Sequence, residues 1–331
     1  MNFKPMKKNH VKFLTLVLFA VAAMTARAEL DVITKTFPVK AGGKLTVNVD
    51  RGSIHITTSD SDKVDVKITR ELKLVSAAEA KDVFTKHQIK LASTNNEVII
   101  DAPNPQKGFS FNNPFNRLHV DYVIAIPKKF DINVKTAGGN IDVEDLQGHA
   151  VVSTSGGNLK FDVIKGPLKA HTSGGNITLI KTEGDADVST SGGDLRLGEI
   201  EGNLVANTSG GNITLEKTKG TVKASTSGGD IHVKEAYGPI TAHTSGGNVS
   251  VQLNAQPKAA CSLKTSGGNV DVKLNAKVAL DLNAQTSGGR ITSDFPGIFN
   301  KQKTKLDAQI NGGGTDLVLK TSGGDITIRK Q

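Results

Sequence analysis

The chain of 331 residues contains no Trp, only two Tyr and a single Cys. A wide globular core is normally filled with aromatic rings, so this composition predicts a thin interior made of Ala, Val, Leu and Ile. One cysteine, Cys261, can form neither an internal disulfide nor a cysteine-based metal site. Burial and hydrogen bonding must therefore hold the fold together.

No apolar run is long enough to form a membrane-spanning helix, which needs about 20 apolar residues. The longest apolar run, from Phe13 to Met24, follows a basic stretch and precedes Ala26-Arg27-Ala28. This order is typical of a secretory signal that is cleaved before Glu29. We predict that residues 1–28 are a signal peptide and that the rest has no transmembrane segment. The protein is then exported, with the periplasm as the expected location and the cell surface or the medium as alternatives.

A strong excess of one charge is missing once this leader is set aside. The whole chain has a formal net charge of +9, but the leader holds five basic residues and no acidic one. The remainder has 36 of the 41 basic residues against 32 acidic ones. Binding of nucleic acid needs Lys and Arg gathered on one face, so we expect no nucleic-acid partner.

Glycine is abundant, with 35 residues, and much of it belongs to a repeated Thr-Ser-Gly-Gly unit. The spacing is 18 residues for the first seven copies and then 21 for two more, and a last copy follows near the end. The copies begin at Thr136 (where Ala replaces Ser), Thr154, Thr172, Thr190, Thr208, Thr226, Thr244, Thr265, Thr286 and Thr321. Such a period is typical of a solenoid with one unit in each coil.

Residues at fixed distances from the Thr alternate between apolar and polar, as half-buried strands do. Leu168 precedes Thr172 in this way, and Ile177 and Leu179 follow it. We therefore predict an all-β fold, a parallel β-solenoid (β-helix) with coils of about 18 residues. Each coil has a strand, a Gly-Gly turn, a second strand and a second glycine turn. Cys261 falls in an inward column, so we expect it to be buried.

Asn or Asp stands four residues after the Thr in nine of the ten copies, and Arg290 is the exception. Both residues favour turns, and stacked Asn side chains can form hydrogen bonds along a ladder. A calcium-binding turn is the alternative, but such repeats place Asp in nearly every nine-residue unit. This chain has mostly neutral Asn at twice that period, so we predict no metal and no cofactor.

The repeat divides the chain into regions. Residues 29–135 form an irregular β-rich N-terminal cap or the first part of the solenoid, residues 136–291 the regular repeats, and residues 292–331 the C-terminal coils and cap. Within the cap we expect one short helix, Ala77–Thr85, with Ser76 as its N-cap. The strands expected there are Lys44–Val49, Ser53–Thr57, Val64–Lys73, Val98–Asp101 and His119–Ile126.

One segment of the cap, Pro103–Arg117, holds the densest aromatic cluster outside the leader: Phe109, Phe111 and Phe115. These rings either fold back and plug the cap or form an exposed apolar contact for a partner or a membrane surface. They are the candidate partner-contact residues of the sequence.

The repeat units, the opening motifs around Phe37-Pro38-Val39, Gly43-Lys44-Leu45 and Gly52-Ser53-Ile54, and the strand Val123–Pro127 resemble a widespread bacterial family. Its members are called putative adhesins with β-strand repeats, and the domain is otherwise of unknown function. The resemblance covers nearly all of the chain after the leader. It implies a cell-surface or periplasmic role, and it brings no ligand and no catalytic motif.

The sequence therefore favours an exported, non-enzymatic structural or interaction protein of the cell envelope, adhesin-like, with an unidentified protein or polysaccharide partner. Two alternatives stay open: a polysaccharide-binding or polysaccharide-cleaving β-helix protein, and an envelope-stress signalling partner. Cleavage needs paired carboxylates at a fixed separation, whereas the acids here are scattered singly among the coils. His171 and His243 lie four coils apart, about 19 Å at strand spacing, which is too far to share a metal. We predict no catalytic residues.

Overall fold

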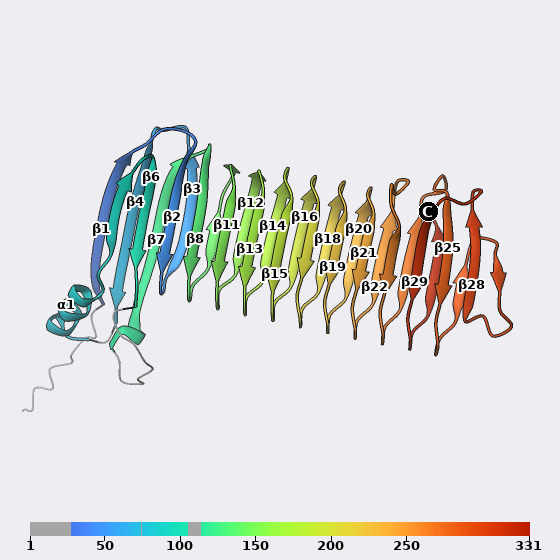
Figure 1. The fold of residues 1–331 in the computed structure, drawn as a ribbon. Coiled ribbons are helices and arrows are strands. Elements are labelled where there is room, and N and C mark those ends of the chain that lie inside the picture. Colours follow the sequence, from blue (N-terminus) through green and yellow to red (C-terminus); the bar gives the residue numbers. More distant parts are fainter. Residues whose placement is uncertain (1–27, 74, 105–113) are drawn as a thin grey trace, which may run out of the picture.

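The computed structural model describes residues 28–73, 75–104 and 114–331. Over these residues the chain forms an elongated, flattened solenoid, in which two long sheets face each other across a thin core (Figure 1). The predicted all-β solenoid is confirmed. Helical structure in the described part is confined to α1 (Ala77–Lys86) and the short 3-10 helix η1 (Pro114–Arg117), both in the N-terminal region.

The two walls, named sheet A and sheet B, each contain 15 strands among the described residues. Sheet A has the spatial order β1 (Glu29–Pro38), β4 (Lys63–Leu72), β7 (Leu118–Pro127), β3 (Ser53–Ser59), β9 (Ile141–Val143), β12 (Leu159–Lys165), β14 (Ile177–Thr182), β16 (Leu195–Ile200), β18 (Ile213–Thr218), β20 (Ile231–Ala236), β22 (Val249–Leu253), β24 (Val270–Leu274), β30 (Ile326–Lys330) and β26 (Ile291–Ser293), with β10 (Leu146–Gln147) beside β12. Sheet B has the order β27 (Ile298–Phe299), β28 (Lys305–Ile310), β25 (Leu280–Gln285), β29 (Thr315–Lys320), β23 (Cys261–Lys264), β21 (Ile240–His243), β19 (Val222–Ser225), β17 (Leu204–Asn207), β15 (Ala186–Thr190), β13 (Leu168–Thr172), β11 (Ala150–Thr154), β8 (Phe130–Thr136), β2 (Gly43–Val49), β6 (Glu97–Ala102) and β5 (Lys90–Thr94).

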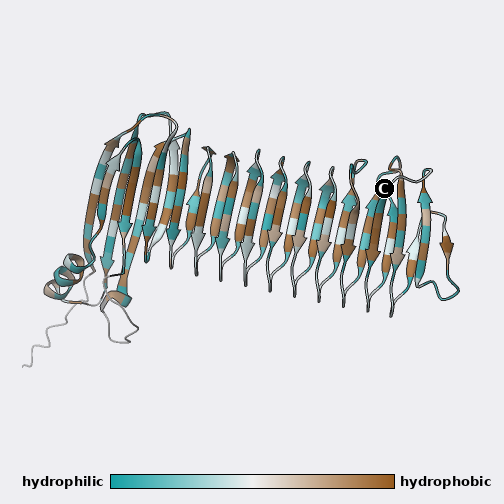
Figure 2. Cartoon of the chain, viewed as in Figure 1, coloured by the Kyte–Doolittle hydropathy of each residue, from teal (hydrophilic) through white to brown (hydrophobic). Residues whose placement is uncertain are grey.

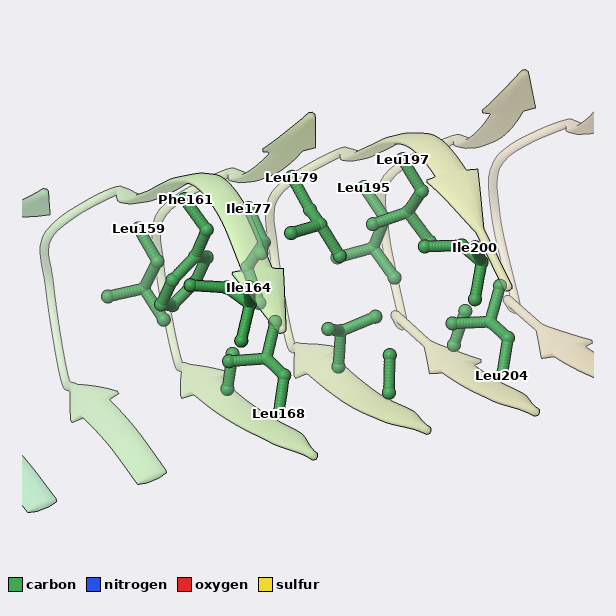
Figure 3. Close-up of a cluster of buried hydrophobic side chains, with 14 of the residues drawn as sticks. Leu159, Phe161, Ile164, Leu168, Ile177, Leu179, Leu195, Leu197, Ile200 and Leu204 are labelled. Carbon is green, nitrogen blue, oxygen red and sulfur yellow. The ribbon is translucent and has the colours of Figure 1, made fainter. Parts of the chain in front are cut away.

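The repeat sets the register between coils, because each strand residue of the regular coils pairs with the residue 18 positions later. Ile177 pairs with Leu195, for example, and Leu195 pairs with Ile213. The inward columns are buried and meet between the sheets (Figure 3), and hydropathy alternates along the strands (Figure 2). Burying one Leu or Ile side chain contributes about 1.5–3 kcal/mol, so stacking like on like is the main source of stability.

The Thr of each unit is buried and bonds two neighbouring turns. Thr172 Oγ1 donates a hydrogen bond of 2.8 Å to the carbonyl oxygen of Gly157 in the preceding coil. The same oxygen accepts a bond of 3.3 Å from the backbone N–H of Gly175 in its own turn. A buried hydroxyl needs such partners, and the arrangement recurs from coil to coil.

The Asn/Asp column forms the hydrogen-bonded ladder that the sequence predicted, with backbone amides as the donors. Asn140 Oδ1 accepts a bond of 2.8 Å from the backbone N–H of Asn158, and each following copy repeats the bond. The last bond runs from the N–H of Arg290 to Asp325 Oδ1, at 2.8 Å. Arg290 lies in the turn before β26, the end strand of sheet A. No further coil follows there, so this position does not need to accept a hydrogen bond.

The N-terminal cap contains the expected strands and helix, together with three further strands, β1, β5 and β8. Ser76 caps α1, and its hydroxyl accepts a bond of 3.2 Å from the N–H of Glu79. Strand β4 is antiparallel to both of its neighbours, β1 and β7, and β5 is antiparallel to β6. Strand β8 pairs with both β2 and β11, so the sheets continue from the cap into the repeats. The division of the chain at residues 28, 135 and 291 stays a prediction.

The C-terminal coils do not stack in the order of the sequence. Strand β30 lies between β24 and β26, and β29 lies between β23 and β25. The last Thr-Ser-Gly-Gly unit is thus inserted between the two preceding ones. Beyond it, the antiparallel strands β28 and β27 end sheet B. The segments that break the register, around Phe295 and Gly313, provide the connections for this insertion.

Candidate functional site

Of the three phenylalanines predicted as partner contacts, the structure describes Phe115. Its ring is only 2% exposed, and its backbone carbonyl accepts a hydrogen bond from Arg51 Nη1. A ring buried in this way plugs the cap and offers no surface to a partner, so the contact interpretation fails for Phe115. Phe109 and Phe111 lie outside the described residues, and their role as contacts stays a prediction.

The histidines occupy separate places. His171 and His243 lie in one outer column of sheet B, on β13 and β21, with β15, β17 and β19 between them. His171 Nδ1 is hydrogen-bonded to Ser189 Oγ at 3.0 Å. His232 lies on sheet A, on β20. Within the described ranges, no group of three or more His, Cys, Asp or Glu side chains could hold a metal ion.

Cys261 is buried, as its column predicted, with 1% exposure. The backbone N–H of Ile240 lies 3.4 Å from its sulfur. Burial raises the pKa of the thiol above its ordinary value, which keeps it protonated and unreactive.

The cap contains a buried polar cluster beside α1. His87 Nε2 lies 3.7 Å from Asp50 Oδ1, and the buried Tyr122 hydroxyl has no hydrogen-bond partner among the described residues. Burial raises the pKa of Asp50, but the neighbouring His87 and Arg51 outweigh it and hold the pKa below its ordinary value. Burial and the Asp50 charge raise the pKa of Tyr122 well above its usual range. We assign this buried cluster to the stability of the cap.

Charged side chains on sheet A alternate in sign from strand to strand. Lys181, Glu199 and Lys217 are neighbours on β14, β16 and β18, and Lys217 Nζ lies 3.1 Å from Glu199 Oε1. Hydrogen bonds from Lys219 and Lys181 lower the pKa of Glu201. Exposed pairs of this kind each contribute little to stability, but the alternation avoids placing like charges side by side.

A groove of about 590 Å³ lies on the outer face of sheet A, over β20, β22, β24 and β30. These strands are next to one another in the sheet, in the C-terminal half of the rod (Figure 1). Ser250, Asp271 and Thr327 are half-buried in its floor, and Gln252 contributes an amide. Each side chain points outward because it alternates with an inward residue of the core.

Two cations of this groove are direct neighbours, with no acidic residue between them. Lys273 and Arg329 are paired in register on neighbouring strands, and both are exposed. Neither forms an ion pair within the described part of the chain, whereas Lys234 Nζ lies 2.7 Å from Glu216 Oε1. The groove therefore presents two adjacent unneutralised positive charges above a floor of hydroxyl, amide and carboxylate groups.

The sequence predictions missed the groove, although the repeat contains a signal for it. The eighth residue after the Thr is neutral or acidic in the earlier coils, as in Ile180 and Glu216, and basic in Lys234, Lys273 and Arg329. These basic residues form one positively charged surface only because β30 lies beside β24, which the sequence does not show. The distance between residues 273 and 329 along the chain conceals their contact.

Comparison with known proteins gives the family. The model of the family described as Toastrack DUF4097 matches residues 43–329. The chain belongs to this family. The match covers the cap and the repeats alike, so the family resemblance predicted from the motifs is confirmed. No curated protein matches the chain.

Solved structures of several bacterial proteins are similar to this Toastrack chain. A putative adhesin of Bacteroides fragilis NCTC 9343 is 15% identical, with a TM-score of 0.36, over 91% of this chain and 97% of that one. A putative adhesin of Parabacteroides distasonis ATCC 8503 is 14% identical, with a TM-score of 0.32 and the same coverage. A putative lipid binding protein of that strain is 12% identical, with a TM-score of 0.29 and the same coverage.

No helix of the Toastrack chain is long and apolar enough to cross a membrane, within the residues that the structure describes.

Proposed function

We propose that the protein is an exported, non-enzymatic interaction protein of the bacterial envelope, which binds an extended partner with the outer faces of its solenoid. One observation carries the proposal. The hydrogen bonds of the Thr and Asn/Asp columns fix every coil at strand spacing, so the outer side chains form straight, rigid columns. Repeat solenoids present long faces of this kind to extended partners.

Export rests on the composition of residues 1–28, with its basic start, apolar run and Ala26-Arg27-Ala28 motif. The periplasm is the proposed location. Producing the full chain in a bacterial host and separating the cell fractions tests this. The expected product lies outside the cytoplasm and begins at Glu29 by mass spectrometry. A chain that keeps its leader and stays in the cytoplasm would contradict the proposal.

Binding is tested with a photoreactive amino acid at Thr178 or Thr214, two half-buried positions on the outer face of sheet A. Irradiation of living cells should link a partner at these positions. The same amino acid at Leu179, which is buried, is the control and should capture nothing from outside. Equal yields from inward and outward positions would contradict binding by the outer face.

Polysaccharide binding is the second candidate, favoured by the polar, positively charged groove on sheet A. Polysaccharide cleavage lacks comparable support, because the groove contains Asp271 and Glu235 but no observation shows them placed as a catalytic pair. Incubation of the chain with a bound polysaccharide should leave its length unchanged and produce no new reducing ends. The third alternative, an envelope-stress signalling partner, has no observation that favours it.

Phe109 and Phe111 stay proposed contacts. Changing both to Ser while keeping the buried Phe115 should reduce partner capture and leave the melting temperature unchanged. Reduced melting temperature with unchanged capture would contradict this role.

A further inference from the structure

The groove over β20, β22, β24 and β30 contains an arrangement that does not favour folding. Like charges on directly neighbouring strands destabilise a sheet, and parallel strands bring Lys273 and Arg329 to about 4.8 Å spacing. On β14, β16 and β18, by contrast, the charged residues Lys181, Glu199 and Lys217, one position further along each strand, are neighbours of opposite sign. An anion bound between the two cations would remove their repulsion and accept charged hydrogen bonds from both side chains.

The floor of the groove indicates what else the ligand carries. Ser250 and Thr327 offer hydroxyl groups that donate and accept, and Asp271 offers a carboxylate that only accepts. All three are half-buried at the bottom of the groove. A ligand that fits them must contain hydroxyl donors as well as negative charge. A sugar that carries a carboxylate has both.

Other anions fit less well. The large apolar side chains that are exposed elsewhere on the described surface, such as Ile180 and Ile298, do not line this groove, so an acyl chain would find no apolar contact. Asp271 and Glu235 would repel a dense row of phosphates. Lys234 and Lys273 are two strand steps apart, about 10 Å, so the positive charge extends along the rod and suits a polymer.

We propose that this groove binds an acidic polysaccharide, with Lys273 and Arg329 on its carboxylates and Ser250, Asp271 and Thr327 on its hydroxyl groups. The inference rests on the proposed function, since it assigns a ligand class to one outer face. The polymer lies along the solenoid axis and crosses β20, β22, β24 and β30 in turn. Lys234 provides a third cation, which also forms an ion pair with Glu216.

The test measures binding of the full chain to polygalacturonate, with neutral dextran as the comparison polymer, by calorimetry at low salt. The double variant Lys273→Glu/Arg329→Glu should bind polygalacturonate at least about tenfold more weakly. The matched control is Lys169→Glu/Lys223→Glu, which changes the net charge equally on the outer face of sheet B. Both control lysines are exposed and form no ion pair within the described residues.

A third variant, Ser250→Phe, fills the floor without changing the charge. It should weaken binding to a similar degree, because the ring would occupy the space of the sugar. Ser250 points away from the core and aromatic residues favour strands, so the variant should fold, and circular dichroism checks this. Raising the salt concentration should weaken wild-type binding.

Three results would overturn the inference. The first is equal loss of binding in the groove variant and the sheet B control, which would indicate non-specific attraction. The second is unchanged binding in Ser250→Phe. The third is charge-dependent binding to phosphatidylglycerol vesicles but not to polygalacturonate. The proposed function is judged separately, because its photocrosslinks at Thr178 and Thr214 lie outside the groove.

Discussion

At the scale of single residues, the two glycines of each repeat unit have different roles. A Cβ atom on Gly211 would lie 1.9 Å from the carbonyl oxygen of Gly193 in the preceding coil. A Cβ on Gly210, the preceding residue, would lie 3.4 Å from the oxygen of Gly192, an ordinary contact. Neither has a positive φ. The second glycine is therefore needed because adjacent coils approach closely there, rather than because of its backbone conformation.

We expect Gly211→Ala to destabilise the protein by more than about 2 kcal/mol, because the methyl group would push two coils apart. Gly210→Ala should change stability by less than about 1 kcal/mol. Thermal unfolding followed by circular dichroism compares the two variants. Similar melting temperatures for both would show that coil contact does not distinguish the glycines.

Asp50 links stability to pH. Its pKa lies below the ordinary value of 3.8 in the folded protein, so the folded state holds the ionised form more favourably than the unfolded state does. This contribution is complete above about pH 4 and is lost as the pH falls through the folded pKa. Asp50→Asn should therefore melt lower than wild type at pH 7, with a smaller difference at pH 2–3.

Melting curves across this pH range measure the effect, and Asp60→Asn is the control, because the Asp60 side chain is 84% exposed. A difference between wild type and Asp50→Asn that stays constant with pH would contradict the linkage.

At the scale of elements, the strands at the ends of the solenoid need protection from other chains. Strand β1 pairs with β4 on one side only, and β5 pairs with β6 on one side only. Lys35 on β1 donates a hydrogen bond of 3.4 Å to the carbonyl oxygen of Leu91 on β5 and lies 5.0 Å from the ring of Phe37. A charged side chain on an edge strand discourages pairing with another chain.

Replacing Lys35 by Ile should therefore produce dimers and larger assemblies, because the edge of β1 would become an apolar, unpaired strand. Size-exclusion chromatography with light scattering measures this at several protein concentrations. Lys40→Ile, which removes an exposed lysine outside the strand, is the control and should stay unchanged. A monomeric Lys35→Ile variant would show that other features protect the edge.

At the scale of the whole molecule, periodicity predicted the coils but not their order. The columns around the Thr identified inward residues such as Leu179 and Cys261, because a solenoid stacks equivalent residues of successive coils on one another. For the same reason every coil offers nearly the same edge, so the sequence does not reveal that β30 lies between β24 and β26. The groove could not be predicted either, because Lys273 and Arg329 become neighbours only through this insertion. The burial of Phe115 depends on the irregular cap, which has no repeat to guide prediction.

The insertion can be tested by hydrogen exchange. Strands β29 and β30 come last in the described sequence, yet both have neighbours on either side. Their amides should exchange as slowly as those of β23 and β24, while the end strands β26 and β27 exchange faster. Fast exchange throughout residues 315–330 would show that the last coil lies at the end of the rod instead.

The inserted coil also determines when folding can finish. Whether it leaves a ribosome or, as proposed, a secretion channel, the chain emerges N-terminus first, and the coils up to β24 can stack as they emerge. Strands β25 and β26 emerge next, before their parallel partners β29 and β30. These two strands must wait with unpaired edges, which are open to aggregation. Coil-by-coil growth therefore stops at β24, and the segment from β25 to β30 is completed in a single late step.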